Sequence, residues 1–167
     1  MKPMKIIPTV LLVIVAVPVV AVIAGQLGAF RGRAPDSLGV RDGRLAPPAR
    51  TPNSVTSQPD SAASRSPGYD PRIAPLRFTG DPAAAMQKLA DLVAATEGTQ
   101  IITRQPDYLY AQATTRLMKF IDDVEFYLDA PAGLIQVRSA SRVGKGDMGV
   151  NRARIEALRA RFETGLR

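Results

Sequence analysis

The sequence predicts an α+β fold, in which an antiparallel sheet carries two helices on one face, behind an N-terminal transmembrane helix and a linker. Three observations predict this arrangement. An uncharged apolar run covers residues 6–30, a Pro- and Ser-rich stretch covers 31–69, and alternating strand patterns between two helical patterns fill 70–167. Strands that are gathered between helices favour a sheet of about four to five strands with both helices packed on one face.

The N-terminal run is long enough to cross a bilayer. Ile6 to Phe30 carries no charged residue, and a helix needs about 20 residues to cross the hydrocarbon core. Lys2 and Lys5 before the run, and Ala24 within it, also fit a secretory signal with a cleavage site. Because the run exceeds a typical signal core, the sequence favours an uncleaved anchor or signal anchor over residues 1–30.

Two sequence signals disagree about which side of the membrane the C-terminal domain occupies. The arginines that follow the run are Arg31, Arg33, Arg41, Arg44 and Arg50. The positive-inside rule would keep the following domain in the cytoplasm, whereas long domains translocate despite flanking charge. The signal-like start favours export. We therefore expect a single-pass protein of the inner membrane with its C-terminal domain in the periplasm.

Composition excludes several classes of chemistry. The chain has 167 residues, no cysteine and no histidine, which removes disulfides, cysteine-ligated metals, the Ser-His-Asp triad and the usual general base. The net charge of +7 is concentrated in residues 1–69, where it favours anionic lipid headgroups. The near-balanced charge of residues 70–167 argues against nucleic acid. We expect no metal, no cofactor and no nucleic-acid partner.

Residues 31–69 predict a spacer. The stretch is rich in Pro, Ser, Ala and Thr and has few large apolar side chains. Such a segment buries too little surface to offset its ordering entropy, and proline keeps it extended. The sequence therefore places the start of the folded domain at residue 70.

The folded domain is predicted to begin with a short strand over Ile73 to Thr79. Asp81 then serves as an N-cap, with Pro82 in the first helical turn. The apolar face of this helix is formed by Met86, Leu89, Ala90 and Val93. Gly98 is expected to close the helix as its C-cap.

Four strands and a closing helix follow. The strands are expected over Thr99–Arg104, Tyr108–Arg116, Asp122–Asp129 and Leu134–Arg142, because polar and apolar residues alternate in them. The helix is expected from about Met148 to Gly165, with Ile155, Leu158 and Phe162 on its apolar stripe.

The last two strands predict their own register. If Pro131 and Ala132 form the tip of a hairpin, apolar residues face apolar residues and an acid faces a base. The resulting pairs are Phe126 with Val137, Leu128 with Ile135, and Glu125 with Arg138. Asp122 then lies opposite Ser141 on the covered face, where a carboxylate needs hydrogen-bond partners.

The densest polar cluster lies in these strands and in the glycine-rich loop 143–149. The loop leads into a helix whose free N–H groups can bind an anion. The candidate ligand-facing residues are Arg138, Ser139, Ser141, Arg142, Asp147, Asn151 and Arg152. A simpler interpretation stays open, in which Asp147 or Asn151 caps the helix and Arg142 pairs with Asp123.

Three acids form a second candidate group. Asp122, Asp123 and Glu125 invite a metal or paired-carboxylate interpretation, but alternation sends Asp122 to the opposite face from the other two. We therefore expect buried or paired acids and no shared metal. The enzymatic alternative is a hydrolase or transferase that uses Asp122 or Asp123 as general base, with the arginines stabilising negative charge.

The run FIDDVEFYLD, followed by IQVRSASRVGKGDMGVNRARIEAL, resembles the bacterial and plastid domain-of-unknown-function family numbered 1499. The residues that carry the resemblance are Phe120, Asp122, Asp123, Val124, Glu125, Phe126, Arg138, Ser139, Ala140, Ser141, Arg142, Gly144, Asp147, Gly149, Asn151, Arg152 and Arg154. It extends over residues 45–162. The family often starts with a Pro-Asn-Cys-Val-like segment, which here reads Pro52-Asn53-Ser54-Val55, and a second nearby cysteine is also missing.

The resemblance implies a membrane-anchored or exported protein and no particular activity. Together with the residue patterns, it predicts a membrane-anchored envelope domain that is non-enzymatic and binds a partner protein or an anionic ligand. The hydrolase or transferase remains the alternative.

Overall fold

The computed structural model describes residues 6–59 and 68–164. Lys2, Lys5 and residues 60–67 of the predicted spacer lie outside these ranges. The elements in chain order are α1 (Ile6–Gln26), β1 (Ser54–Thr56), β2 (Leu76–Arg77), α2 (Pro82–Ala94), β3 (Thr99–Arg104), β4 (Tyr108–Thr114), β5 (Ile121–Asp129), β6 (Leu134–Ser141) and α3 (Val150–Thr164).

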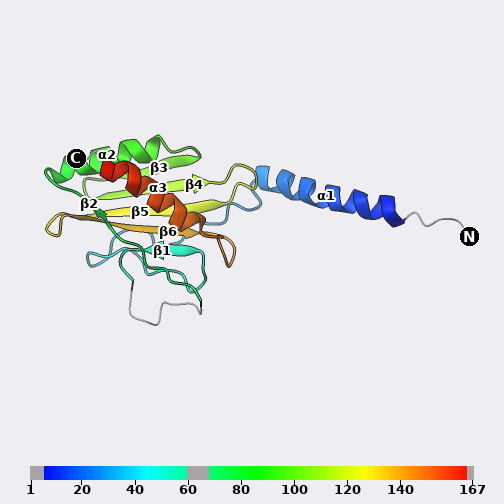
Figure 1. Cartoon of the computed structure of the whole chain (residues 1–167), viewed down its shortest axis with the longest axis horizontal. Coiled ribbons are helices and arrows are strands. Elements are labelled where there is room, and N and C mark those ends of the chain that lie inside the picture. The colour runs from blue at the N-terminus through cyan, green and yellow to red at the C-terminus, as the bar shows by residue number, and fades with distance from the viewer. Residues whose placement is uncertain (1–5, 60–67, 165–167) are drawn as a thin grey trace, which may run out of the picture.

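The strands form one antiparallel sheet in the order β1-β6-β5-β4-β3, and β2 pairs with β6 beside β1 (Figure 1). The predicted α+β class is confirmed. The sheet has six strands within the described residues, one more than the upper end of the expected range, because β1 comes from the stretch that was predicted to be a spacer.

The predicted register of the last hairpin is confirmed. Phe126 pairs with Val137, Glu125 with Arg138, and Asp122 with Ser141. A shift by one residue would carry the apolar side chains of β5 to the opposite face. The alternation in the sequence was therefore sufficient to determine this pairing.

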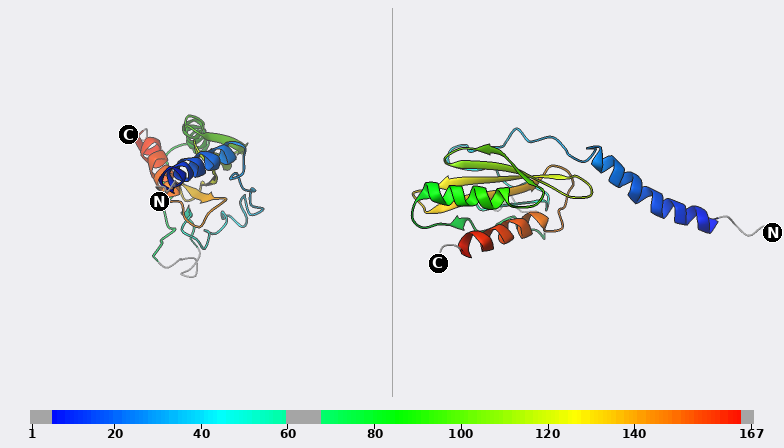
Figure 2. Two further views of the ribbon diagram at one scale, coloured as in Figure 1. Left: turned by 90° about the vertical axis from the view of Figure 1, so that its right-hand side faces the viewer. Right: turned by 90° about the horizontal axis from the view of Figure 1, so that it is seen from above.

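Helices α2 and α3 lie side by side on one face of the sheet (Figure 2, right). The core beneath them includes Leu89, Phe126 and Phe162. Asp81 caps α2 as predicted, since its Oδ2 accepts a hydrogen bond from the Ala84 amide at 2.8 Å. The expected C-cap is wrong: α2 ends at Ala94 with Ala95 as its C-cap, and Gly98 instead forms the left-handed turn into β3 at φ +72°.

The second face of the sheet is covered by the N-terminal segment 31–59. Leu45 packs there against Tyr108 and Tyr110, with Leu38 and Val40 beside them. β1 joins the sheet edge, and Val55 is fully buried. The prediction of a spacer over 31–69 is thus wrong for its described first part. Its apolar residues are few, but β1 and its flanks bond to the main chain of β6.

Helix α1 projects from one end of the domain (Figure 1). Its last turn is docked on the loop between β4 and β5: Gly25 is buried against the Met118 carbonyl, and Gln26 Nε2 donates to the Leu117 carbonyl at 2.8 Å. Phe30 then stacks on Phe120 with ring centroids 5.2 Å apart. Within residues 6–59 and 68–164, no helix has both the length and the apolar content needed to cross a membrane. The transmembrane part of the fold prediction is therefore not confirmed.

Candidate functional site

Strand β5 delivers three carboxylates to the middle of the sheet. Asp122, Asp123 and Glu125 are 4%, 1% and 0% exposed. Because side chains alternate along a strand, Asp122 faces α3, whereas Asp123 and Glu125 face the N-terminal segment. The three carboxylates are thus divided between two polar clusters.

Glu125 is the centre of the first cluster. Its Oε2 accepts from Arg138 Nη1 at 2.8 Å, across the β5–β6 ladder. Its Oε1 accepts from the Tyr108 hydroxyl and from the Gly39 amide, both at 2.8 Å. Burial, together with the neighbouring Glu125 carboxylate, raises the pKa of Tyr108 well above its ordinary value. The Tyr108 hydroxyl therefore stays protonated at neutral pH and donates its hydrogen bond to Glu125.

Asp123 extends this cluster towards the end of β6. Arg142 grips its carboxylate with Nη2 at 2.7 Å and Nε at 3.0 Å, the two-point geometry that favours arginine over lysine. The Tyr110 hydroxyl donates to the same carboxylate at 2.6 Å. Hydrogen bonding to Asp123 raises the pKa of Arg142, and burial, followed by the bond to Asp123, raises the pKa of Tyr110.

Asp122 belongs to the second cluster, beneath α3. Its Oδ2 accepts from Arg154 Nη2 at 2.6 Å. Arg154 Nη1 also donates to the Oδ1 of Asn151 at 2.9 Å and to the hydroxyl of Ser139 at 3.1 Å. The ion pair therefore fastens the first turns of α3 to the central strands.

Asn151 joins the second cluster to the N-terminal segment. Its Nδ2 donates to the Asn53 carbonyl at 3.1 Å and to the Ser141 hydroxyl at 3.0 Å. The Ser139 hydroxyl donates to its Oδ1 at 2.5 Å. The side chain is completely buried and fully bonded, so its role in this structure is to hold three segments together.

The N-terminus of α3 is already capped by the protein. Asp147 accepts from the amide of Gly149 at 2.9 Å and from the amide of Asn151 at 3.0 Å. Asn53 Nδ2 also holds the glycine-rich loop by donating to the Gly144 carbonyl at 2.8 Å. The Asn151 amide, one of the free helix donors on which the anion hypothesis relies, is thus bonded to Asp147.

The structure does not gather the predicted ligand set on one surface. Arg138 and Arg142 lie under the N-terminal segment, whereas Ser139, Ser141 and Asn151 lie beneath or beside α3. Arg152 reaches away from both groups and donates to the main-chain carbonyls of Asp70 and Arg72. Across residues 6–59 and 68–164, every buried side-chain nitrogen and oxygen has a hydrogen-bond partner, and no group of acids has the arrangement of a metal site.

A cavity of about 200 Å³ opens between loop 143–149 and the start of β5. Asp122, Ser141 and Asp147 supply polar groups to its wall. Its apolar lining was not among the predicted site residues, and consists of Phe120, Val143, Met148 and Val150. No apolar pattern pointed to a cavity here, because Val143 stands alone in the glycine-rich loop and Met148 was expected at the start of the closing helix, which begins at Val150.

The family model that describes proteins of unknown function (DUF1499) matches residues 44–162. This match covers more than half of the chain. The chain belongs to the DUF1499 family. No curated protein matches it.

The DUF1499 match begins at residue 44 and so includes β1 and part of the segment on the second face. Ser54, which stands where the resemblance expects a cysteine, lies in β1 and is fully buried. Its hydroxyl accepts a hydrogen bond from the Ala49 amide at 2.8 Å. In this DUF1499 chain the position therefore helps to fold the N-terminal segment onto the sheet edge.

Proposed function

We propose that this DUF1499 chain is a non-enzymatic binding or assembly module of the cell envelope, and that α1 holds it at a lipid surface. Its partner would be an envelope protein or an anionic ligand. The observation that carries the proposal is the exposure of α1, whose apolar side chains from Val10 to Val20 are all exposed within the part of the chain that the structure describes.

The exposed side chains of α1 form a continuous apolar surface. Leu12 is 68% exposed, Ile14 63% and Val17 62%, and Ile6–Gln26 contains no charged residue. Leaving apolar area in water costs about 25 cal/mol per Å², and exposed patches of this kind mark surfaces that contact a membrane or a partner. A lipid surface would remove this cost.

The arrangement of the polar clusters argues against catalysis by these acids. Asp122 and Asp123 lie on opposite faces of the sheet, and each is held in an ion pair with an arginine. A general base needs to reach the proton that it removes. We therefore do not propose the hydrolase or transferase.

The lipid contact is tested by flotation of the full chain with neutral phosphatidylcholine vesicles. We expect the wild-type chain to float and Ile14→Lys/Val17→Lys to lose at least about tenfold in partitioning, since each lysine costs about 2.5 kcal/mol or more in an apolar membrane environment. Gln100→Lys/Ile102→Lys, which adds the same charge on exposed positions of β3, is the matched control. Equal flotation of the two variants would contradict the proposed contact of α1 with lipid.

We also place the DUF1499 domain on the exported side of the inner membrane, in the periplasm. The basic start of the chain, and the membrane-anchored or exported character that the family resemblance implies, support this side. A reporter enzyme that becomes active only after export, fused after Arg167, is expected to be active. Activity confined to a cytoplasm-dependent reporter fused at the same residue would place the domain on the other side.

A further inference from the structure

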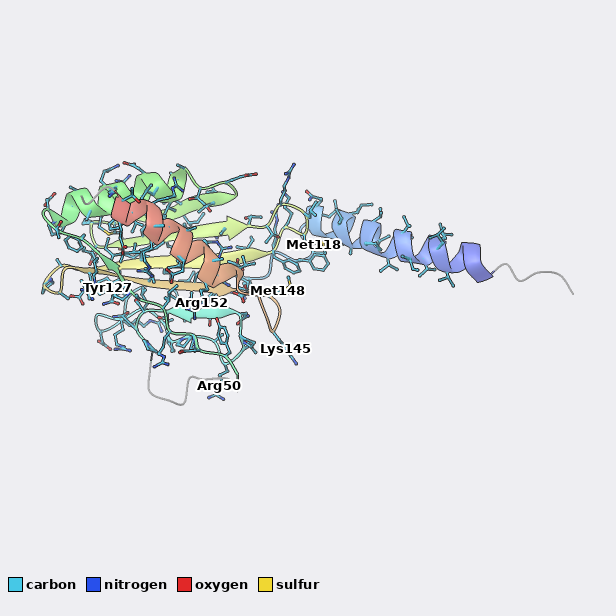
Figure 3. All side chains as sticks on the ribbon, viewed as in Figure 1. Arg50, Met118, Tyr127, Lys145, Met148 and Arg152 are labelled. Atoms are coloured by element: carbon cyan, nitrogen blue, oxygen red, sulfur yellow. The ribbon has the colours of Figure 1, made fainter. Side chains whose placement is uncertain are left out.

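The end of the domain from which α1 projects carries an unusual number of apolar side chains in water. Figure 3 shows Met118 at the inner end of α1, and Met148 and Lys145 on the side of the domain that faces α1. In the loops that flank this end, Met148 is 100% exposed and Leu117 63% exposed. Val143 is also exposed, and it contacts the chain directly after α1, next to Gly32.

Both loops present these side chains from a constrained backbone. Met148 has φ +52° and Lys119 has φ +56°, a left-handed conformation that costs a residue with a side chain about 1–2 kcal/mol. Asp147 and Asn151 hold the loop around Met148 in place through the α3 cap. The fold thus fixes Met148 beside the cavity between loop 143–149 and the start of β5, with its side chain fully exposed.

Basic residues stand in the same two loops and in the chain that follows α1. The cations here are Arg31, Arg33, Arg116, Lys119 and Lys145, all exposed except the half-buried Lys119. Of the acids beside these loops, Glu97 lines a cleft with Arg116 and Asp147 is engaged in capping α3. Asp122, which lines a cavity with Val143 and Met148, is neutralised by its ion pair with Arg154. This end of the domain therefore has a surplus of positive charge.

We propose that these two loops form a membrane-proximal rim, defined by Leu117, Lys119, Val143, Lys145 and Met148, that lies on an anionic lipid bilayer. The proposal rests on the proposed function, because α1 would bring the rim to the same bilayer. The apolar tips enter the boundary between headgroups and acyl chains, and the cations meet anionic headgroups, each contributing about 1 kcal/mol. Because α1 and the rim would both contact the bilayer at one end of the domain, together they would fix the orientation of the DUF1499 domain on the membrane.

The charge and apolar pattern both favour a bilayer over a protein partner. Lysine and arginine keep their charged ends in the headgroup layer while their aliphatic stems cover apolar surface. The rim also adjoins the end of α1, where Gly25 lies against Met118, and the chain that follows α1, where Gly32 lies against Val143. A bilayer that contacts the rim therefore also contacts the C-terminal end of α1.

The chain contains no tryptophan, so a single introduced tryptophan reports on its own surroundings. We expect full-chain Met148→Trp to show a blue-shifted emission, and quenching by brominated lipid, when vesicles containing phosphatidylglycerol are added. The matched control is Ala132→Trp in the exposed turn between β5 and β6, at the opposite end of the strands. Its emission is expected to stay unchanged.

Reversing the charge of Lys145 on the rim and of Arg116, which precedes Leu117 in the same loop, tests the electrostatic part. Arg116→Glu/Lys145→Glu, combined with Met148→Trp, is expected to lose at least about tenfold in apparent affinity for anionic vesicles, at about 1 kcal/mol per charge. Binding of the same variant to neutral vesicles through α1 is expected to remain. Urea midpoints and circular dichroism verify that the substituted chains are folded.

The outcomes separate this inference from the proposed function. If the chain floats with vesicles while Trp at position 148 stays in water, the rim proposal fails and the lipid contact of α1 stands. If charge reversal leaves anionic binding unchanged, the assignment to an anionic surface is also overturned. If the chain binds neither neutral nor anionic vesicles, both proposals fail.

Discussion

A fragment that begins at Asp70 is expected to lose its cooperative fold, whereas a fragment that begins at Arg31 keeps it. The shorter fragment lacks β1 and the cover over the second face of the sheet. In this fragment the C-terminal half of β6 would lose its pairing with β1. The Glu125 carboxylate would lose the hydrogen bond that it accepts from the Gly39 amide. Buried polar groups that lose their partners cost about 1–3 kcal/mol each, and more when they are charged, so several such losses approach a domain's entire stability of about 5–15 kcal/mol.

Near-ultraviolet circular dichroism and urea unfolding of the two fragments measure this difference. The fragment from Arg31 is expected to show a sigmoidal transition, and the fragment from Asp70 a gradual one with increased dye binding. Fragments that start between Ala34 and Leu45 would locate the boundary. A sharp, matching transition in the fragment from Asp70 would show that the N-terminal segment contributes little to stability.

Glu125→Ala is expected to destabilise the full chain by about 3–5 kcal/mol, the range for breaking a buried ion pair. The substitution leaves Arg138 buried without its carboxylate, and removes the acceptor of both the Tyr108 hydroxyl and the Gly39 amide. The midpoint of urea unfolding, with an unchanged slope, measures the loss. The control is Glu156, which pairs with Arg159 but whose side chain is 50% exposed, so Glu156→Ala is expected to cost less than about 1 kcal/mol.

A double substitution distinguishes an unpaired charge from a loss of packing. Glu125→Leu/Arg138→Met removes both charges, and apolar replacements of buried ion pairs are often neutral or stabilising. We expect the double variant to recover most of the stability that Glu125→Ala loses. If it is as unstable as the single variant, the cost lies in packing or in the bonds to Tyr108 and Gly39.

Strand alternation was sufficient to predict the centre of the sheet. The pairing of β5 with β6 follows from matching Phe126 to Val137 and Glu125 to Arg138, because a strand has a period of two and only one register places both sets correctly. The Asp81 cap and the apolar stripe of α3 were also correctly predicted, since they are local patterns. The pairing of Arg142 with Asp123, held open in the sequence as an alternative, is the arrangement that the structure contains.

The N-terminal segment escaped prediction because its apolar residues are isolated. Leu38, Val40, Leu45 and Val55 are separated by polar residues and prolines, so no periodic pattern announces an element. Leu38, Val40 and Leu45 pack in one cluster with Tyr108 and Tyr110. Val55 lies in β1 at the edge of the sheet. The main-chain hydrogen bonds of β1 supply the rest, and these do not depend on side-chain type.

By itself, the sequence determined the local patterns of this protein: its apolar N-terminal run, the sheet and helices of its core, and its resemblance to the DUF1499 family. Only the tertiary structure decided which distant groups several polar residues meet. Asp122 meets Arg154, Glu125 meets Gly39, and Asn151 meets Asn53 across long stretches of chain. A hydrogen bond depends on distance and direction in space. Residue type and spacing therefore indicate which groups need a partner, and the folded structure determines which partner each of these groups has.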